Sequence, residues 1–243
     1  MNLSIIIPVF EERQKIAHDI QAASTFLTSR QLTGEIIVVD DGSRDDTALI
    51  AKRVEVAPSL QLNVIRYERH KGKGFAVRAG VRESRGDDVM FADSGLCVPY
   101  QNALAGLHLI KSGACEIAHG SRRLKESQII KPQAWHRRLT ARIFRWLVVY
   151  WIKIPAHLTD TQCGFKIYRG EVARELYGEC LTHGFMFDIE IILRALRKGY
   201  RIREFPIQWT CDLDSRLSFT RTPKQIWREM RNIKRLEKSI EPP

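Results

Sequence analysis

Residues 36–47, which read IIVVDDGSRDDT, constrain the fold more than any other stretch of this chain. The four β-branched apolar residues at 36–39 suit a strand that is buried on both faces of a parallel sheet. Asp40 and Asp41 follow at once, so they would lie at the carboxyl end of that strand, where open α/β sheets bind their ligands. Asp-Gly-Ser is also common in ordinary turns between a strand and a helix, and this stretch alone leaves both interpretations open.

Similar segments alternate along the first half of the chain. Short apolar runs predict strands, and amphipathic stretches between them predict helices. This alternation is typical of a doubly wound α/β fold, a Rossmann-like and mostly parallel sheet with helices on both faces. The predicted strands span residues 3–9, 36–39, 60–67, 89–93 and 115–121, and the predicted helices span residues 15–32, 45–56, 75–84 and 100–111.

Two further segments carry residues that suit an anionic ligand. Residues 70–74, His-Lys-Gly-Lys-Gly, follow a predicted strand and precede a predicted helix. Their glycines let the backbone approach a ligand closely, and the lysines and helix amides can meet phosphate. Solvated turns of this composition are also common, so the loop alone is a weak signal. The strand over 89–93 ends in Asp93, which adds a third aspartate to the same edge of the predicted sheet.

The charge balance points to an anionic partner. The chain of 243 residues has 39 basic and 28 acidic side chains, a formal net charge of +11. Such an excess suits nucleotide phosphate, nucleic acid or an acidic membrane surface, but no motif for nucleic-acid binding accompanies it. The five cysteines are an odd number without a CxxC pair, which predicts the reduced thiols of a cytosolic protein rather than disulfides or a zinc site.

No segment is expected to cross a membrane. Residues 3–9 already form a predicted strand with no basic leader before them, so we expect no signal peptide. The longest fully apolar run, residues 147–152, is far shorter than the roughly 20 residues of a spanning helix. A protein of this sequence that works at a membrane would therefore lie on its surface.

The segment from 121 to 153 is strongly basic, with nine basic residues and one acid. Within it, Arg138, Arg142 and Arg145 have helical spacing and would share one face, beside a second face of aliphatic and aromatic residues. A helix of this kind can lie in a membrane interface. A helix packed on its own domain with a solvated basic face is an equally good interpretation. Residues 216–238 repeat the bias, with eight basic residues against two acids.

The order of these motifs resembles that of a known family. The segments that carry the resemblance are 8–12, 38–47, 72–80 (GKGFAVRAG), 91–93 (FAD), 120–122, 160–166 (DTQCGFK), 187–190 and 215–217. Together they are similar to inverting family-2 glycosyltransferases of the branch that transfers hexoses to polyprenyl (dolichyl) phosphate. GKGFAVRAG and DTQCGFK look most like the dolichyl-phosphate glucosyltransferases, with the mannosyl enzymes as neighbours. The implied fold is the glycosyltransferase A fold.

The resemblance implies a role for each matched residue. On the donor side it implies Pro8 and Glu12 in the nucleotide pocket, Asp40 or Asp41 at the base or ribose, Lys73 beside the donor, and Asp93 as the first acid of a DxD metal motif. On the acceptor side it implies Gln162, Asp188 and Glu190, with Arg122 and Arg216 at the phosphates. We assign catalysis to Asp93, Asp188, Arg122 and Arg216. Simpler interpretations stay open, because Asp188 and Glu190 suit a helix start and Arg216 suits a solvated surface.

Two departures from the family pattern bear on metal binding and on the donor pocket. Glu11 takes the place of the usual Asn after the first strand, and the family's DADxQ is here Asp93-Ser94-Gly95-Leu96-Cys97. The second acid is thus Gly95, and Cys97 stands at the Gln position. Mg²⁺ and Mn²⁺ prefer carboxylate, carbonyl and water oxygens over thiol sulfur. We expect Asp93 to be the one metal ligand left in this motif, and dependence on Mg²⁺ or Mn²⁺ to be weakened.

The implied reaction is attack by a phosphate oxygen of a polyprenyl phosphate on C1 of a nucleotide sugar, UDP-glucose or GDP-mannose, with inversion. A phosphate monoester is largely dianionic at neutral pH, so no strong base is needed. Arginine and lysine would hold the acceptor in line and neutralise the leaving diphosphate. Two other functions stay open: transfer to a sugar or protein hydroxyl with Asp188 or Asp160 as the base, and non-catalytic binding of a nucleotide sugar or anionic lipid.

The resemblance also implies how the chain is organised. Residues 1–243 would form a single domain, with a nucleotide-sugar-binding half over 1–122 and an acceptor-side half over 123–220. The basic amphipathic segment would span 135–153, and a basic C-terminal helix would span 221–243. The protein would lie as a peripheral protein on the cytoplasmic face of a membrane, without nucleic acid as a partner.

Overall fold

The computed structural model describes residues 1–131, 135–211 and 228–235, and for residues 136–138 it describes the backbone alone. Its centre is a seven-stranded sheet in the order β3-β2-β1-β4-β7-β5-β8. All neighbouring strands are parallel except β7, which runs antiparallel to both β4 and β5. The strands are β1 (Leu3–Val9), β2 (Gly34–Asp40), β3 (Gln61–Arg66), β4 (Asp88–Ala92), β5 (Ile117–Ser121), β7 (Phe165–Arg169) and β8 (Ile202–Pro206).

The β-branched run at residues 36–39 lies in β2 and is fully buried. Successive side chains of a strand point to opposite faces of the sheet. Ile36 and Val38 accordingly join the hydrophobic cluster on one face, and Ile37 and Val39 join the cluster on the other. The prediction of a strand buried on both faces is confirmed.

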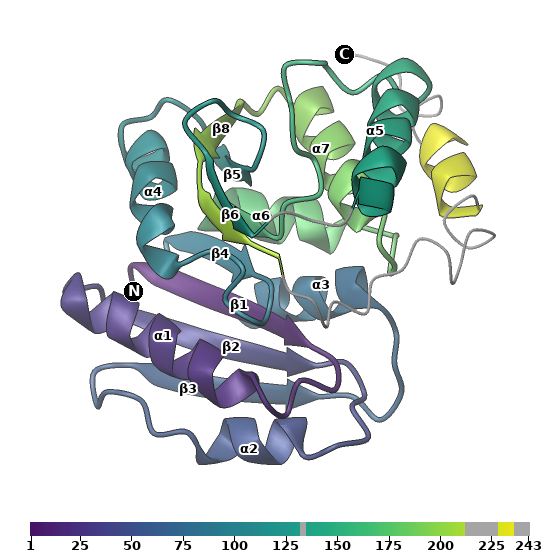
Figure 1. Ribbon diagram of the computed structural model, residues 1–243. Helices are drawn as coiled ribbons and strands as arrows, with labels where there is room; N and C mark the ends of the chain where they lie inside the picture. Colours follow the sequence, from purple (N-terminus) through teal and green to yellow (C-terminus); the bar gives the residue numbers. More distant parts are fainter. Residues whose placement is uncertain (132–134, 212–227, 236–243) are drawn as a thin grey trace.

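Helices cover both faces of the sheet (Figure 1). The predicted strands and helices of the first half are confirmed with shifted ends, since the helix expected to reach residue 56 ends at Arg53. One face carries α1 (Ile16–Ser29), α2 (Thr47–Arg53) and α4 (Ala103–Lys111), the last preceded by a 3₁₀ turn over Tyr100–Asn102. The other face carries α3 (Lys73–Glu83), α6 (Gly170–Gly178) and α7 (Phe187–Arg197).

The reversed direction of β7 brings two parts of the chain to one edge of the sheet. Parallel strands end at that edge, whereas an antiparallel strand begins there. Ala92, at the end of β4, pairs with Phe165, at the start of β7. Just beyond them the amide of Asp93 donates a hydrogen bond of 2.8 Å to the carbonyl of Gly164. The segment 160–166 therefore meets the ends of the parallel strands.

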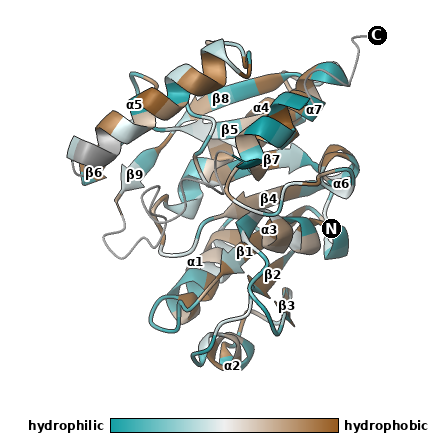
Figure 2. Cartoon of the chain, turned by 90° about the vertical axis from the view of Figure 1, so that its right-hand side faces the viewer, coloured by the Kyte–Doolittle hydropathy of each residue, from teal (hydrophilic) through white to brown (hydrophobic). Residues whose placement is uncertain are grey.

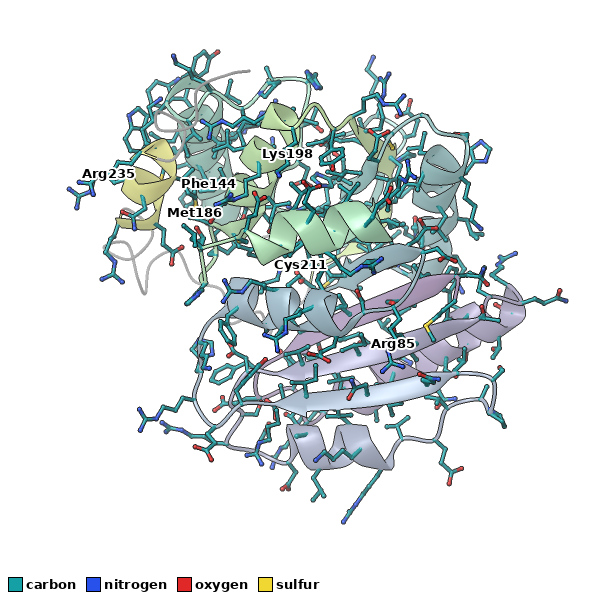
Figure 3. All side chains as sticks on the ribbon, turned by 180° about the vertical axis from the view of Figure 1, so that it is seen from behind. Arg85, Phe144, Met186, Lys198, Cys211 and Arg235 are labelled. Atoms are coloured by element: carbon teal, nitrogen blue, oxygen red, sulfur yellow. The ribbon has the colours of Figure 1, made fainter. Side chains whose placement is uncertain are left out.

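Helix α5 (Trp135–Tyr150) packs against the sheet face that carries α3 and α7, through buried Phe144 and Val148. The helix over residues 228–235 joins the same hydrophobic cluster, and Figure 3 shows Phe144 and Met186 beside the helix that carries Arg235. A short parallel pair, β6 (Gln128–Lys131) and β9 (Gln208–Thr210), lies apart from the main sheet.

The expectation of a basic outer face on α5 is wrong for Arg145. Its guanidinium donates hydrogen bonds to the carbonyls of Leu158 and Thr159 at 3.1 and 2.5 Å and to that of Ala156 at 2.9 Å. Since Phe144 and Val148 take the inner apolar positions, a second set of apolar side chains faces outward, as the hydrophobic colour along α5 in Figure 2 indicates. The exposed members are Trp135, Leu139, Ile143, Trp146 and Tyr150. None of the helices over the described ranges is long and apolar enough to span a bilayer.

Candidate active site

Lys73 and Asp93 form an ion pair at the carboxyl edge of the sheet. Lys73 opens α3 and Asp93 follows β4, so the ends of two elements bring their side chains together. The ammonium nitrogen lies 2.6 Å from Oδ1 of Asp93, although that oxygen has no aligned hydrogen bond. Burial lowers the pKa of Lys73, but Asp93 and Asp188 outweigh it and hold that pKa above its usual range. The lysine is therefore a fixed positive charge beside the aspartate of the predicted metal motif.

A second lysine–aspartate pair lies deeper, between β7 and α7. The ammonium of Lys166 contacts Oδ1 of Asp188 and also donates to the carbonyl of Thr161 at 3.0 Å. The two side chains are 0% and 3% exposed. Burial raises the pKa of Asp188, against the opposing effect of both lysines. Asp188 was predicted from the motif pattern, whereas Lys166 was quoted only as part of DTQCGFK and its charge was missed.

Arg122, directly after β5, is held by Asp160. Its Nε and Nη2 donate to the two carboxylate oxygens of Asp160 at 2.6 and 2.7 Å, and its backbone amide donates to Oδ2 at 3.0 Å. Burial raises the pKa of Asp160, but the guanidinium outweighs burial and lowers that pKa to about 2. The amide of Asp160 donates in turn to Glu204, and the guanidinium lies 5.3 Å from the ring of Trp209. Such a bidentate pair is strong and directional.

Asp41 organises the glycine–lysine loop. Its carboxylate accepts hydrogen bonds of 2.7 Å from the backbone amides of Lys71 and Gly72 and lies 2.9 Å from Nδ1 of His70. Asp40 behaves differently, because its Oδ1 accepts the amide of Ser43 while its Oδ2 makes no hydrogen bond among the described residues and lies 3.6 Å from Nε of Arg66. The two predicted aspartates thus meet at the edge, where Asp41 binds backbone amides and Asp40 forms a looser pair with an arginine.

Asp19 is a residue of this edge that sequence reasoning missed. It lies on the buried face of α1 and accepts hydrogen bonds from Ser94 Oγ at 2.7 Å and from the amide of Gly95 at 3.0 Å. Burial raises the pKa of Asp19, against these hydrogen bonds. The available signal was an acid beside Ile16 and Ile20, where an amphipathic helix should present apolar side chains.

The other predicted site residues differ in where they lie and in what they contact. Pro8 lies near the end of β1, and Glu12 lies in the following loop with its carboxylate 3.4 Å from the ammonium of Lys15. Gln162 has both side-chain amide atoms buried and without a hydrogen-bond partner in the described ranges. Glu190 instead accepts from the amides of Leu181 and Thr182. Arg216 lies outside the described residues.

A divalent metal ion fits the described residues poorly. Asp93 is the one carboxylate of the motif, and Lys73 already lies against it. Gly95 supplies an amide that Asp19 binds, and Cys97 supplies sulfur, which Mg²⁺ and Mn²⁺ do not favour. Within the part of the chain that the structure describes, no three His, Cys, Asp or Glu side chains gather as a metal site. None of the five cysteines forms a disulfide.

Taken together, the edge carries charges of both signs from segments far apart in the sequence. Lysine and arginine side chains can neutralise a phosphate-rich leaving group, and backbone amides at the start of α3 can contact it. In open, mostly parallel sheets this edge is where ligands, nucleotides among them, bind. The chain belongs to glycosyltransferase family 2, since the family model described as glycosyl transferase family 2 matches residues 4–177.

Within this family, the chain is similar to dolichyl-phosphate beta-glucosyltransferases. The chain is 31% identical over 219 residues to the dolichyl-phosphate beta-glucosyltransferase of Homo sapiens, which covers 86% of this chain and 67% of that protein. It is 29% identical over 224 residues to the enzyme of the same name from Saccharomyces cerevisiae, covering 85% and 66%. The chain thus spans about two thirds of the length of these relatives. The predicted family is confirmed, and the chain is a glycosyltransferase.

Solved structures confirm the predicted fold. A glucosyl-3-phosphoglycerate synthase from Mycobacterium tuberculosis, in complex with Mn²⁺, UDP and glucosyl-3-phosphoglycerate, superposes with a TM-score of 0.71 at 16% identity, covering 99% of this chain and 81% of that chain. TarS of S. aureus gives 0.63 at 17% identity, covering 96% and 64%. At such identities the likeness establishes the glycosyltransferase A fold alone.

Proposed function

We propose that the protein transfers a hexose from a nucleotide sugar to a polyprenyl phosphate with inversion. Of the two candidate sugars, we favour glucose over mannose. The similar proteins of Homo sapiens, Dictyostelium discoideum and Mus musculus are dolichyl-phosphate beta-glucosyltransferases. This similarity supports dolichyl phosphate as the acceptor class and glucose as the sugar. The chain spans only about two thirds of those proteins, so the argument for this chain rests on its own site.

One observation carries the choice of acceptor: both candidate general bases are engaged in ion pairs. A hydroxyl acceptor needs a base within hydrogen-bond reach of its proton. Asp188 is 3% exposed and bound by Lys166, and Asp160 is bound by Arg122 with its pKa lowered to about 2. A phosphate acceptor is already ionised at neutral pH and needs no base. The geometry therefore favours a phosphate nucleophile over a sugar or protein hydroxyl.

In this proposal the reaction is a single displacement. A phosphate oxygen of the acceptor forms a bond to C1 of the sugar, the bond from C1 to the donor diphosphate breaks, and the nucleoside diphosphate leaves with that electron pair. Attack from the side opposite the leaving group inverts the configuration at C1. The chain's part is to hold both phosphates in line and to offset their negative charge.

We assign the donor to the edge formed by Pro8, Glu12, Asp40, Asp41, Lys73 and Asp93. Asp40 is the better candidate to contact the base or ribose, because Asp41 accepts two backbone amides of the 70–72 loop, whereas Oδ2 of Asp40 has Nε of Arg66 at 3.6 Å and no hydrogen bond. We assign the acceptor to Gln162 and Arg216, within the half over 123–220, and to Arg122, directly before it. The buried amide of Gln162 has polar atoms that a ligand could satisfy.

We also propose that α5 docks the protein on the cytoplasmic face of a membrane. Its outward side chains Trp135, Trp146 and Tyr150 are 76%, 59% and 70% exposed, and aliphatic side chains lie between them. Aromatic residues of this kind favour the membrane interface, and a net charge of +11 favours anionic lipid. The contact is thus mainly apolar, with exposed Arg142 beside it, rather than the basic face that the sequence suggested.

A transfer assay tests the enzymatic proposal. UDP-glucose, GDP-mannose and UDP-N-acetylglucosamine are crossed with a polyprenyl phosphate and with a soluble sugar acceptor. The expected product is extractable into organic solvent, is labile to mild acid, and forms best from UDP-glucose. Transfer to the soluble sugar at a comparable rate would reject the phosphate acceptor, and donor binding without any transfer would favour a non-catalytic binder.

Liposome binding tests the docking surface. Trp135→Ser with Trp146→Ser should reduce co-sedimentation with anionic vesicles at all salt concentrations, because apolar contact is insensitive to screening. Arg142→Glu, the matched charge change on the same helix, should reduce binding mainly at low salt. Binding by the double tryptophan variant that equals that of the native protein would reject α5 as the docking element.

A further inference from the structure

The loop from Asp93 to Cys97 has an unusual backbone. Gly95 has a φ of +92° and Leu96 a φ of +46°, so two consecutive residues lie in the left-handed region. For leucine this conformation is disfavoured and persists only where the surroundings impose it. The loop carries Asp93, and its shape therefore decides where that carboxylate points.

Asp19 holds this loop from beneath. Both carboxylate oxygens lie 3.0 Å from the amide nitrogen of Gly95, and Oδ2 also accepts the Ser94 hydroxyl at 2.7 Å. Successive backbone amides in such a turn form a concave site that suits an anion. Here the anion is a side chain of the chain itself, 1% exposed and fixed on α1.

Further contacts fasten the two ends of the loop. The amide of Asp93 donates to the carbonyl of Gly164, and the carbonyl of Cys97 accepts the amide of Thr210 at 2.9 Å. A Cβ added at Gly164 would lie 2.0 Å from Oδ2 of Asp93, so the carboxylate lies directly on that glycine. The loop is therefore shaped by protein contacts along its whole length.

Lys73 completes the arrangement from the other side. Its ammonium lies on Asp93 and at 5.7 and 5.9 Å from the ring centroids of Phe91 and Phe187, so the positive charge is confined among fixed groups. A divalent ion that bound Asp93 would have to displace an ammonium already tethered there. Arg122, the other cation considered for this task, is held by Asp160.

We propose that Asp19 is a positioning residue of the donor site and that Lys73 supplies the positive charge for the donor diphosphate, so that nucleoside diphosphate binds without a divalent ion. This inference rests on the proposed function and names how that same site recognises its donor. Glycine at position 95, in place of the second acid of the metal motif, then fits this arrangement, because the amide of Gly95 donates a hydrogen bond to Asp19. An aspartate restored at position 95 would have to adopt a φ of +92°, which L side chains rarely adopt.

The first test measures UDP binding by calorimetry in EDTA and in Mn²⁺, for native protein, Lys73→Met and Lys111→Met. Lys111 is the control with the same change of charge, since it ends α4 and acts on Asp88, at the start of β4 and away from the edge that carries Lys73. Native protein should bind UDP equally well in both buffers. Lys73→Met should bind at least about tenfold more weakly in EDTA and gain more from Mn²⁺ than native protein does, whereas Lys111→Met should change little.

The second test examines Asp19 by the same measurement in EDTA, together with a thermal melt. Asp19→Ala should weaken UDP binding about tenfold while the KM for the acceptor stays constant. Asp19→Asn keeps one acceptor oxygen for the Gly95 amide and should recover part of the loss. Ser94→Ala is the control, because it removes only the hydroxyl and leaves the backbone contact.

Each outcome decides one point. Native protein that binds UDP only with Mn²⁺, or Lys73→Met that binds like native protein in EDTA, would overturn the role of Lys73. Asp19→Ala that melts earlier but binds UDP normally while folded would reduce Asp19 to a structural group. If native protein binds no nucleoside diphosphate in either buffer, the proposed function itself fails, a result distinct from binding that requires metal.

Discussion

Two lysine–aspartate pairs flank the same aromatic ring and differ in burial. The ammonium groups of Lys166 and Lys73 lie 5.5 and 5.7 Å from the centroid of Phe91. The side chains of Lys166 and Asp188 are 0% and 3% exposed, whereas those of Lys73 and Asp93 are 19% and 35% exposed. The inner pair lies between β7 and α7, and the outer pair lies at the edge where a ligand would arrive.

The difference in exposure predicts different roles for the two pairs. A buried ion pair cannot exchange its partner for water or ligand, so losing one member leaves an uncompensated charge. A partly exposed pair is screened by water, and its charges can act on a charged ligand that reaches it. We therefore expect the inner pair to stabilise the frame, which would make Asp188 a structural rather than a catalytic residue, and the outer pair to be available to a substrate.

The largest effect is expected from breaking the inner pair. Lys166→Met should lower the free energy of unfolding by about 3–5 kcal/mol, because Asp188 would be buried without the ammonium that contacts it. Urea denaturation with circular dichroism measures this. The double variant Lys166→Met/Asp188→Leu should be less destabilised than Lys166→Met, since no charge is left behind. A double variant that loses at least as much would contradict the assignment of this pair as structural.

An intermediate effect is expected at the Arg122–Asp160 pair, whose side chains are 25% and 3% exposed. The pKa of Asp160 is lowered to about 2 from 3.8, so its stabilisation is present above pH 3.8 and is lost as the pH falls toward 2. The loss should total about 2 kcal/mol, with roughly half gone by pH 3. Unfolding free energies of native protein and Asp160→Asn, measured from pH 6 to pH 3, give the difference. Parallel curves for the two proteins would count against the ion pair.

The smallest effect on stability is expected at the outer pair. Lys73→Met should change the free energy of unfolding by about 1 kcal/mol or less, because Asp93 can be hydrated when the ammonium is removed. The same urea titration measures it beside Lys166→Met. Equal destabilisation by the two lysine variants would erase the distinction between a structural and a functional pair.

The first half of the fold was predictable because local pattern and topology agree there. The run at 36–39 is buried on both faces, as its composition requires, and each of the strands β1 to β4 is followed by a helix. Strand β7 was not predicted, because its direction depends on pairing with β4, some 75 residues earlier. The inner face of α5 was also undetermined, since apolar side chains occur on both sides of that helix and only packing selects Phe144 and Val148.

The site was predictable as a set of residues but not as a set of partners. Lys73 and Asp93 were assigned to the donor side, and they lie together. The partners of the other site residues were not predicted. Asp160 binds Arg122, which lies 38 positions earlier in the sequence, and Asp19 binds Gly95, which lies 76 positions later. Motif order gives no distances between segments, so which aspartate binds backbone amides and which pairs with a lysine or arginine is visible only in the folded chain.

The segment from Asp160 to Lys166 leaves little room for change in length. Asp160 holds Arg122, Gly164 supports Asp93, and Lys166 holds Asp188, all within seven consecutive positions that lead into β7. Because side chains alternate along a strand, inserting or deleting one residue near Gly164 would turn Lys166 to the opposite face of the sheet. Homologues of this chain should therefore tolerate substitutions in this segment more readily than insertions or deletions.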